Sequence, residues 1–244
     1  MSWLGCQRIV LDTCASTNDE AARLARAGAK HGTIVIALDQ SRGRGRDGRA
    51  WESPPGGLYL SAVLRPPLAI ADVPPMTLAI GVGACDAART FGAPAVLKWP
   101  NDLLVDGKKL AGVLVEAQSQ SNRLESVIVG IGINIDGVLP PALGAITLAE
   151  AAGTTIDRDA FITCLLARVE RWIDRYAAGG LAAVIPAWHE RMAIGLAARA
   201  TVDGNGVTGL LAGLDEDGAL LLCDNEGRVH RVRSGDVEVL RPAS

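Results

Sequence analysis

The sequence predicts an α+β protein in two parts, a larger part that combines helices with a β-sheet and a small C-terminal β barrel. Some segments have apolar residues at helical spacing, and others are short β-branched runs. Asp106-Gly107 lies between two such runs as a hairpin turn, which makes the sheet at least partly antiparallel. From about Gly195, short β runs alternate with turn clusters, as in a barrel of roughly 50 residues. We expect a boundary close to Met192, with domains at residues 1–192 and 193–244.

The N-terminal third is predicted to contain three strands and one helix. Thr17 and Glu20 have the spacing of a capping box, and apolar residues follow on one face up to Gly28, which predicts a short helix. The expected strands are Arg8–Asp12, Thr33–Leu38 and Leu58–Leu64. A loop rich in Gly and Arg separates the last two strands, which we expect to be buried.

The middle of the chain alternates helices with β runs. Pro74-Pro75 suits the start of a helix, and Met76–Phe91 is apolar all round, which predicts a buried helix. Four β runs follow at Ala95–Lys98, Leu103–Val105, Lys108–Glu116 and Leu124–Ile135. A second capping box spans Thr147–Glu150. A long helix ending near Gly179 should bury one apolar side formed by Phe161, Leu165, Val169, Trp172, Ile173 and Tyr176.

The C-terminal segment has the turn rhythm of a small barrel. Its expected turns lie at residues 203–206, 215–218, 224–227 and 234–236.

The composition is that of a soluble globular protein, with a net charge of -3, 49% hydrophobic residues and 21% charged residues. The longest apolar stretches fall far short of the about 20 residues that span a bilayer, and Met1–Arg8 has no secretory signal pattern, so we expect a cytoplasmic protein without a membrane segment. Five cysteines without a C-x-x-C pair and three scattered histidines favour reduced thiols and no metal centre.

The loop sequence GRGRDGRAW, residues 43–51, formally contains the G-x-G-x-x-G pattern of dinucleotide-binding proteins. That interpretation fails because the residues that follow, up to Pro54-Pro55, cannot propagate the helix that a Rossmann fold requires. A kinase glycine loop is excluded because no H-R-D or D-F-G signature follows, and a P-loop because no G-x-x-x-x-G-K-[ST] is present.

The same loop carries a local charge of +3 on glycine hinges, from Arg42, Arg44, Arg46, Arg49 and Asp47. Guanidinium groups suit phosphate and carboxylate oxygens, so the loop is predicted to wrap an anion. Trp51 adds a flat face on which a base could stack. The alternative is a surface Arg-Gly loop that binds nucleic acid or nothing, which its position between two core strands disfavours.

A second segment, KWPNDLLVDGKKLAG at residues 98–112, predicts that a lysine and an aspartate face one cleft. The hairpin turn returns Lys109 to the level of Asp102, and neighbouring strand residues point to opposite faces, so only one of Lys108 and Lys109 points inward. Gly112 inside a strand permits close approach by a ligand, with a β-bulge as the structural alternative.

Four motifs together resemble the biotin protein ligases: GRGRDGRAW, KWPNDLLVDGKKLAG, the STN of residues 16–18 and the GIGIN of residues 130–134. The resemblance covers nearly the whole chain, including DEDGALLL at residues 215–222. It implies a mixed central sheet flanked by helices, as in class II synthetases, followed by an SH3-like barrel. It also implies that biotin and ATP form biotinyl-5'-adenylate, from which biotin passes to a lysine of a biotin carboxyl carrier protein domain.

The resemblance implies roles for individual residues. Biotin would be bound by Ser16, Thr17, Asn18, Gln40, Gly43, Arg44, Gly45, Arg46, Lys109 and Gly112. ATP would be bound by Arg44, Arg46, Arg49, Trp51, Lys109 and Asn134. Arg46 would clamp the adenylate, Lys109 would contact the carboxylate and the phosphate, and Arg44 would assist. Mg²⁺ would arrive with ATP, and the sequence assigns it no protein ligand.

Two positions depart from the family pattern, since Asp47 is acidic where many relatives carry a base and Asp19 follows the STN motif where relatives often have Gln or another polar residue. Only 15 residues precede Ser16, so we expect a monofunctional ligase without the winged-helix DNA-binding domain of regulatory members, monomeric or weakly dimeric. Two rival functions remain open: a lipoate or octanoate ligase of the same fold, and an RNA- or DNA-binding module that uses the Arg-Gly loop.

Overall fold

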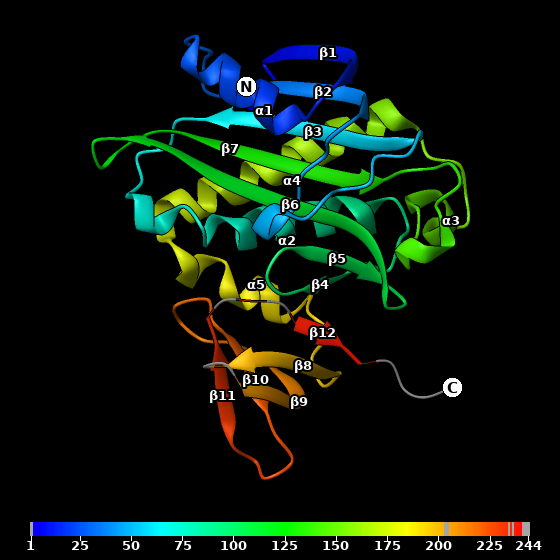
Figure 1. The fold of residues 1–244 in the computed structure, drawn as a ribbon, viewed down its shortest axis with the longest axis vertical. Coiled ribbons are helices and arrows are strands. Elements are labelled where there is room, and N and C mark those ends of the chain that lie inside the picture. Colours follow the sequence, from blue (N-terminus) through cyan, green and yellow to red (C-terminus); the bar gives the residue numbers. More distant parts are fainter. Residues whose placement is uncertain (1, 203–204, 234, 236, 241–244) are drawn as a thin grey trace.

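The structure is a computed structural model that describes residues 2–202, 205–233, 235 and 237–240. The described elements form two sheets, one of seven strands in the larger part and one of five strands in the C-terminal part (Figure 1). Helices pack against the larger sheet, and the smaller sheet lies below it in the view of Figure 1. The α+β prediction is therefore confirmed.

The larger sheet has the spatial order β1-β2-β3-β7-β6-β5-β4. Only β1 and β2 pair in parallel, and the other neighbours are antiparallel, so the sheet is mixed as expected. Its strands are β1 (Gln7–Cys14), β2 (Thr33–Gln40), β3 (Gly57–Leu64), β4 (Val96–Lys98), β5 (Asp102–Val105), β6 (Lys108–Gln120) and β7 (Arg123–Asn134).

Side-chain alternation along the strands gives the larger sheet two different faces. On one face, Leu60 and Ala62 of β3 belong to the main core together with α2 (Met76–Thr90) and α4 (Arg158–Gly179). On the opposite face, Val63 packs in a smaller cluster against α1 (Thr17–Arg26). Because α1 is short, part of this second face is left for the loop that follows β2.

The helix predictions hold with one correction. All six apolar residues predicted for the long helix are buried in α4. The capping box at Thr147 is confirmed in part, because its hydroxyl accepts a bond from the Glu150 amide at the start of α3 (Leu148–Ala152). The capping box at Thr17 is wrong, because Ser16 is the N-cap residue and the Thr17 hydroxyl bonds to Gln40 instead.

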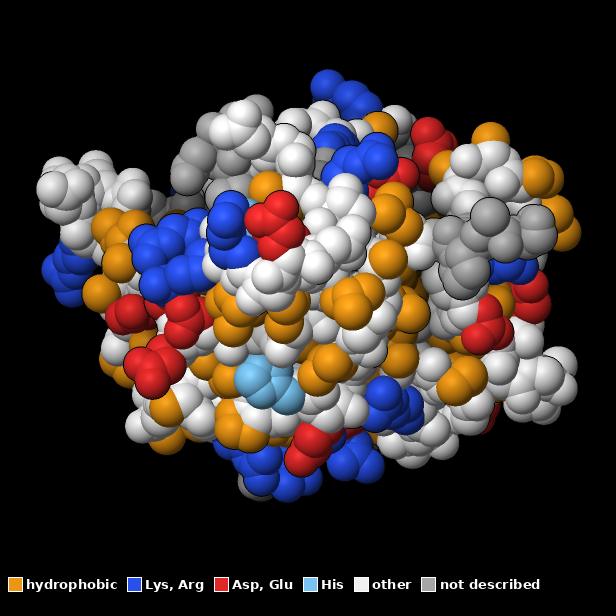
Figure 2. All heavy atoms as spheres, turned by 90° about the horizontal axis from the view of Figure 1, so that it is seen from below, with side chains coloured by type: hydrophobic (Ala, Val, Ile, Leu, Met, Phe, Trp, Pro, Cys, Tyr) orange, Lys and Arg blue, Asp and Glu red, His pale blue; other side chains and the backbone are white. Residues whose placement is uncertain are grey.

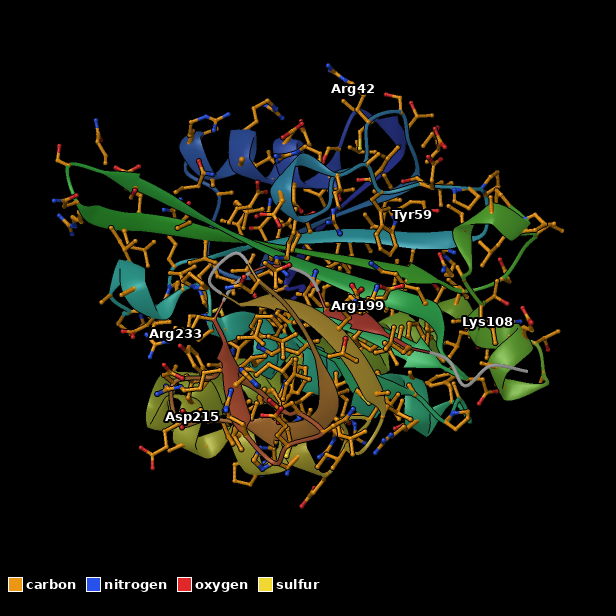
Figure 3. All side chains as sticks on the ribbon, turned by 60° about the horizontal axis from the view of Figure 1, so that its bottom comes forward. Arg42, Tyr59, Lys108, Arg199, Asp215 and Arg233 are labelled. Atoms are coloured by element: carbon orange, nitrogen blue, oxygen red, sulfur yellow. The ribbon has the colours of Figure 1, made fainter. Side chains whose placement is uncertain are left out.

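The β5–β6 hairpin has the predicted two-residue turn. Asp106 and Gly107 both have positive φ, at 49° and 71°, as a type I′ turn requires, and Val105 pairs with Lys108. A register shift leaves Leu110 as the extra residue, so the bulge lies near Gly112 and not at it. Lys108 lies at the rim beside α3, where its Nζ is 3.5 Å from a Glu150 carboxylate oxygen (Figure 3).

The C-terminal sheet has the order β11-β10-β9-β8-β12 and follows a short helix, α5 (Ile185–His189). All its pairings are antiparallel, consistent with a small barrel-like domain. Its strands are β8 (Ala197–Val202), β9 (Asn205–Leu214), β10 (Leu220–Cys223), β11 (Val229–Val232) and β12 (Val237–Val239). Turns lie at the two middle predicted positions, whereas the turns predicted at 203–206 and 234–236 fall partly outside the described residues.

The two parts are in direct contact. The Trp99 indole N–H of the larger part donates to the Gly218 carbonyl of the C-terminal part at 3.0 Å in a buried hydrogen bond. The face seen in Figure 2 carries its basic side chains in separate clusters, with acidic and apolar side chains between them. Among the described residues, no helix has the length and apolar character needed to cross a membrane.

Candidate functional site

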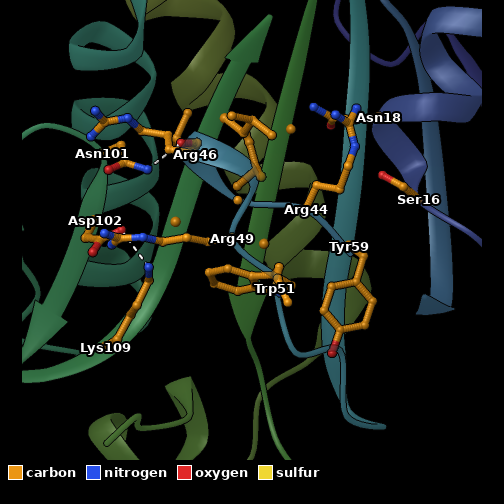
Figure 4. Close-up of a pocket in the computed structure, with 18 of the residues that line it drawn as sticks. Ser16, Asn18, Arg44, Arg46, Arg49, Trp51, Tyr59, Asn101, Asp102 and Lys109 are labelled. Carbon is orange, nitrogen blue, oxygen red and sulfur yellow. Dashed lines mark hydrogen bonds and ion pairs between the residues drawn. The ribbon is translucent and has the colours of Figure 1, made fainter. Parts of the chain in front are cut away.

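A cavity of about 350 Å³ lies on the α1 face of the larger sheet, under the Gly-Arg loop. Every site residue predicted from the sequence lines it except Gly43 and Asn134. The predicted lining residues are Ser16, Thr17, Asn18, Gln40, Arg44, Gly45, Arg46, Arg49, Trp51, Lys109 and Gly112. Segments that are far apart in the sequence thus converge on one space (Figure 4).

The Gly-Arg loop folds back on itself. The Gly45 amide donates to the Arg49 carbonyl at 2.7 Å, and the Trp51 amide donates to the Gly43 carbonyl at 2.9 Å. Asp47 sits at the tip with a positive φ of 54°. In Figure 4, this geometry turns Arg44 towards Asn18, Arg46 towards Asn101 and Arg49 towards Asp102.

Arg44 is held by two carboxylates. Its guanidinium lies 2.8 Å from an Asp19 oxygen and makes two hydrogen bonds to Glu116, at 3.1 and 3.2 Å. Asn18 donates to the same Glu116 carboxylate at 2.6 Å. Asp19 and Glu116 thus offset the charge of Arg44 and would compete with a bound anion for its guanidinium group.

The N-terminus of α1 is tied to β2 and β3 by buried polar side chains. The Gln40 side-chain oxygen accepts bonds from the Thr17 amide and hydroxyl at 2.8 and 3.0 Å. The Ser61 hydroxyl contacts Thr17 Oγ1 at 2.8 Å and Asn18 Oδ1 at 2.6 Å. These bonds fix the polar end of the cavity, and buried polar groups satisfied in this way are costly to disturb.

The floor of the cavity is made of strand glycines. A Cβ at Gly132 would lie 2.6 Å from the Trp51 ring, and one at Gly112 would lie 2.8 Å from it, so the ring rests directly on β6 and β7. A Cβ at Gly130 would overlap the Asn18 side chain in the same way. The close approach expected at Gly112 is therefore made by Trp51 itself, and Trp51 Nε1 is buried without a hydrogen-bond partner among the described residues.

Lys109 points into the cavity, as predicted, and Lys108 does not. The Lys109 ammonium lies 2.7 Å from Asp102 Oδ1 and 5.1 Å from the centre of the Trp51 ring. Lys98 approaches the other Asp102 oxygen at 3.6 Å. Asp102, with only 14% of its side chain exposed, thus orients two lysines at the cavity wall.

Gly43 and Asn134 support the site from outside the cavity. A Cβ at Gly43 would meet the Trp51 carbonyl at 2.5 Å, so glycine is needed where the two arms of the loop meet. The buried Asn134 amide donates to the carbonyls of Lys109 and Ile146, at 3.2 and 3.4 Å, behind the wall that carries Lys109.

Several lining residues were not predicted as site residues. They include Tyr59, Lys98, Asn101, Gly130, Gly132 and Glu238, whereas Asp102 is the aspartate predicted to face the cleft with the lysine. Burial raises the pKa of the Tyr59 hydroxyl far above its usual range, and this hydroxyl donates to the Pro54 carbonyl at 2.6 Å. Lys98 and Asn101 lie within KWPND, whose motif could have indicated them, whereas Glu238 comes from the distant β12 and carries no local signal.

The cavity is cationic overall, since Arg46, Arg49, Lys98 and Lys109 line it beside the paired Arg44, and Asp102 and Glu238 are its acidic lining residues in the part of the chain that the structure describes. Within the part of the chain that the structure describes, no three His, Cys, Asp or Glu side chains are grouped closely enough to hold a metal ion. The arrangement is suited to binding an anion, with a polar recess at one end and an aromatic ring on the floor.

Family models match both parts of the chain. Residues 11–134 match the Biotin/lipoate A/B protein ligase family, and residues 198–240 match the Biotin protein ligase C terminal domain. The first match contains the loop, the β5–β6 hairpin and the floor glycines.

Individual relatives agree with these matches. The chain is 36% identical to the Bifunctional ligase/repressor BirA of Bacillus subtilis, over 97% of this chain and 75% of that protein. It is 33% identical to the Biotin--[acetyl-CoA-carboxylase] ligase of Paracoccus denitrificans, over 87% of this chain and 92% of that protein. A solved biotin protein ligase from Aquifex aeolicus in complex with biotin and ATP superposes with a TM-score of 0.81 at 30% identity, covering 97% of this chain and 100% of that one. The chain therefore belongs to the biotin protein ligase family.

Proposed function

We propose that this protein is an ATP-dependent biotin ligase that forms biotinyl-5'-adenylate and transfers biotin to a lysine of a biotin carboxyl carrier protein domain. The observation that carries the proposal is the convergence of three loop arginines and two lysines on one cavity with a polar recess. Relatives that match most of this chain bear the name of this ligase activity, among them the Mycobacterium tuberculosis protein, which is 34% identical over 96% of this chain.

In the first step, a biotin carboxylate oxygen attacks the α-phosphorus of ATP. A new P–O bond forms, the bond to the β-phosphate oxygen breaks, and pyrophosphate leaves. Because the reaction brings two anions together, much of the barrier is electrostatic, and fixed cations lower it. We assign this role to Arg46 and Lys109, with Arg44 assisting once it leaves its carboxylate partners.

Asp102 acts on this step through Lys109. The 2.7 Å ion pair holds the ammonium on a paired strand, so its position is set before substrates bind. A cation that is already positioned needs no reorganisation when charge develops at phosphorus.

In the second step, the neutral amine of the carrier lysine attacks the acyl carbon of the adenylate. An amide bond forms, the C–O bond to the phosphate breaks, AMP leaves and the amine gives up a proton. The mixed anhydride also reacts with water, so the Gly-Arg loop has to cover it until the carrier arrives. Arg46 would bind the adenylate beneath the closed Gly-Arg loop.

The remaining assignments follow from the same site. The ureido ring of biotin would be bound in the polar recess by Ser16, Thr17, Asn18 and Gln40. Close approach between the loop, the ligand and the sheet would be permitted by the glycines Gly43, Gly45 and Gly112. The nucleotide would be contacted by Arg49 and Trp51. Asn134 would act on it indirectly, through its hydrogen bond to the Lys109 carbonyl. Mg²⁺ would be held mainly by the phosphates, as is usual for this ion.

We also propose a catalytic domain at residues 1–192 and a barrel domain at 193–244. The two sheets and the two separate family matches support this division. Because Val237 and Glu238 line the cavity, the barrel domain would form part of the wall that encloses the site.

The decisive experiment incubates the protein with biotin, Mg-ATP and a carrier domain, and measures the mass of the carrier. The expected result is one added biotin that requires ATP and the target lysine. A parallel reaction with lipoate tests the rival ligase activity, and lipoate transfer without biotin transfer would overturn the proposal.

A further inference from the structure

A second concave site lies on the helical side of the molecule, away from the ligase cavity. It is a hollow of about 280 Å³ between α2, α4 and the segment after α5, and it shares no lining residue with the ligase cavity. Its charged lining consists of Arg89, Arg168, Arg171, Arg175, Arg191 and Asp86.

Close helix packing brings these arginines together. A Cβ at Gly83 of α2 would lie 2.8 Å from the Val169 Cα of α4, so the two helices touch backbone to backbone beside the hollow. Arg168, Arg171 and Arg175 follow one another at helical spacings of three and four on α4, which places them on one side of that helix.

Of the three acidic residues of α4, Asp159 lies in the first turn of the helix, and the two close to the arginines in sequence are engaged elsewhere. Glu170 accepts bonds from the Leu4 amide at 2.6 Å and from the Ser2 hydroxyl at 2.7 Å, and Asp174 accepts from the Trp3 indole at 3.2 Å. Both carboxylates are therefore engaged by the N-terminal segment and do not neutralise the arginines in the hollow.

Asp86 is the single acidic residue among the described residues that line the hollow, and its two oxygens already have partners. One accepts from Arg191 Nε at 2.7 Å and the other from the Trp172 indole at 2.9 Å. No carboxylate among the described residues pairs with Arg168, Arg171 or Arg175. Five arginines stand against Asp86 in the hollow and against Glu190, which lies 3.0 Å from Arg191, so the net local charge is +3 in a chain whose net charge is -3.

Trp172 holds two of the guanidinium groups in place. Arg175 lies 4.7 Å and Arg191 lies 5.8 Å from the centre of its ring. Stacking of this kind reduces the side-chain freedom that a guanidinium would lose on binding a ligand, so the cost of ordering is lower than for free surface arginines.

We propose that this hollow binds a small anion with two or three linked phosphate groups. Guanidinium forks match phosphate oxygens in pairs, and several forks around one hollow suit a compact ligand of high charge. The volume of about 280 Å³ suits a phosphate chain and not a long polymer, which the acidic remainder of the molecule would repel.

The test uses calorimetric titration with tripolyphosphate at low salt. The full chain is first saturated with a non-hydrolysable analogue of biotinyl-5'-adenylate, which fills the ligase cavity and carries no chain of linked phosphates that could compete for the hollow. We expect one equivalent of tripolyphosphate to bind, with an affinity that falls as salt increases. The Arg171→Ala/Arg175→Ala double variant should bind roughly tenfold or more weakly, because two charge-assisted contacts are lost.

The matched control is Arg26→Ala/Arg123→Ala, which removes the same charge from exposed positions that line neither cavity. Arg171→Lys/Arg175→Lys keeps the charge without the forks and should give an intermediate affinity. Thermal unfolding of each variant, with an unchanged midpoint, establishes that the fold is intact.

A titration with ATP identifies the source of the phosphate chain. Equal affinity for ATP and tripolyphosphate would mean that only the chain is recognised, and tighter binding of ATP would make a nucleotide the natural ligand. The proposal is overturned if tripolyphosphate fails to bind, if the control variant loses as much affinity as the double variant, or if only a DNA duplex binds.

Discussion

Two adjacent lysines in the β5–β6 hairpin provide a direct test of the site at the scale of single residues. Lys109→Ala removes the cation that Asp102 holds beside the cavity, so adenylate formation should slow by about a hundred- to a thousand-fold, or about 2.7 to 4 kcal/mol of barrier. Lys108→Ala breaks only an exposed pair with Glu150 and should change the rate little. Single-turnover rates of adenylate formation measure both effects.

The comparison tests the register of the hairpin as well as the role of Lys109. A damaging Lys108→Ala together with a harmless Lys109→Ala would mean that the wrong lysine has been placed at the phosphate.

Asp19 offers a second test, because it holds Arg44 in an exposed ion pair. If Arg44 has to leave Asp19 before it contacts the biotin carboxylate, Asp19→Asn removes that cost. Exposed pairs are worth up to about 1 kcal/mol, so biotin should bind about two- to fivefold more tightly. Asp12→Asn on the exposed side of β1 is the charge-matched control. Equal biotin affinities for Asp19→Asn and the wild type in calorimetric titrations would show that Arg44 does not exchange partners.

At the scale of elements, the glycine floor makes the position of Trp51 depend on β7. Gly132→Ala puts a methyl group 2.6 Å from the indole, and forced repacking of this kind costs about 1 to 3 kcal/mol. We expect Trp51 to be displaced, its fluorescence to shift towards that of an exposed indole, and KM for ATP to rise. Gly206→Ala in β9 is the control, because no atom of the described residues lies within 4 Å of the added Cβ. An unchanged emission spectrum and KM in Gly132→Ala would contradict the proposed platform.

The elements differ in how far the sequence predicts them. The hairpin and the orientation of Lys109 follow from an Asp-Gly turn and strand alternation, which are local signals. The capping box at Thr17 fails because Gln40, which is 23 residues away, competes successfully for the same hydroxyl. Glu116 and Glu238 were missed for a similar reason, since only the fold brings them to Arg44 and to the cavity. Local patterns thus predict elements and their faces, whereas partners that meet across the fold need the structure.

At the scale of the whole molecule, the junction between the two parts can be tested through Trp99. Trp99→Phe removes the indole donor and leaves the Gly218 carbonyl buried without that bond, at a cost of about 1 to 3 kcal/mol in the free energy of unfolding. Since Glu238 of the C-terminal part lines the cavity, we expect the KM values for biotin and ATP to rise as well.

Trp3→Phe is the control for this junction, because its indole bonds to Asp174 in an exposed position where water can replace it. Thermal unfolding and steady-state kinetics measure the two effects. Equal stability losses in the two variants, with unchanged KM values in Trp99→Phe, would argue that the C-terminal part does not help to form the site.

The glycine floor also limits how this enzyme can be redesigned. Residues 112, 130 and 132 already have the smallest side chain, so no substitution there enlarges the binding space, and any substitution pushes Trp51 or Asn18 into it. A directed-evolution library for bulkier biotin analogues should therefore keep these three codons fixed. Diversity belongs instead in the walls, at a position such as Leu114, which lies on the same strand face as Gly112 and where a shorter side chain opens volume without moving the platform.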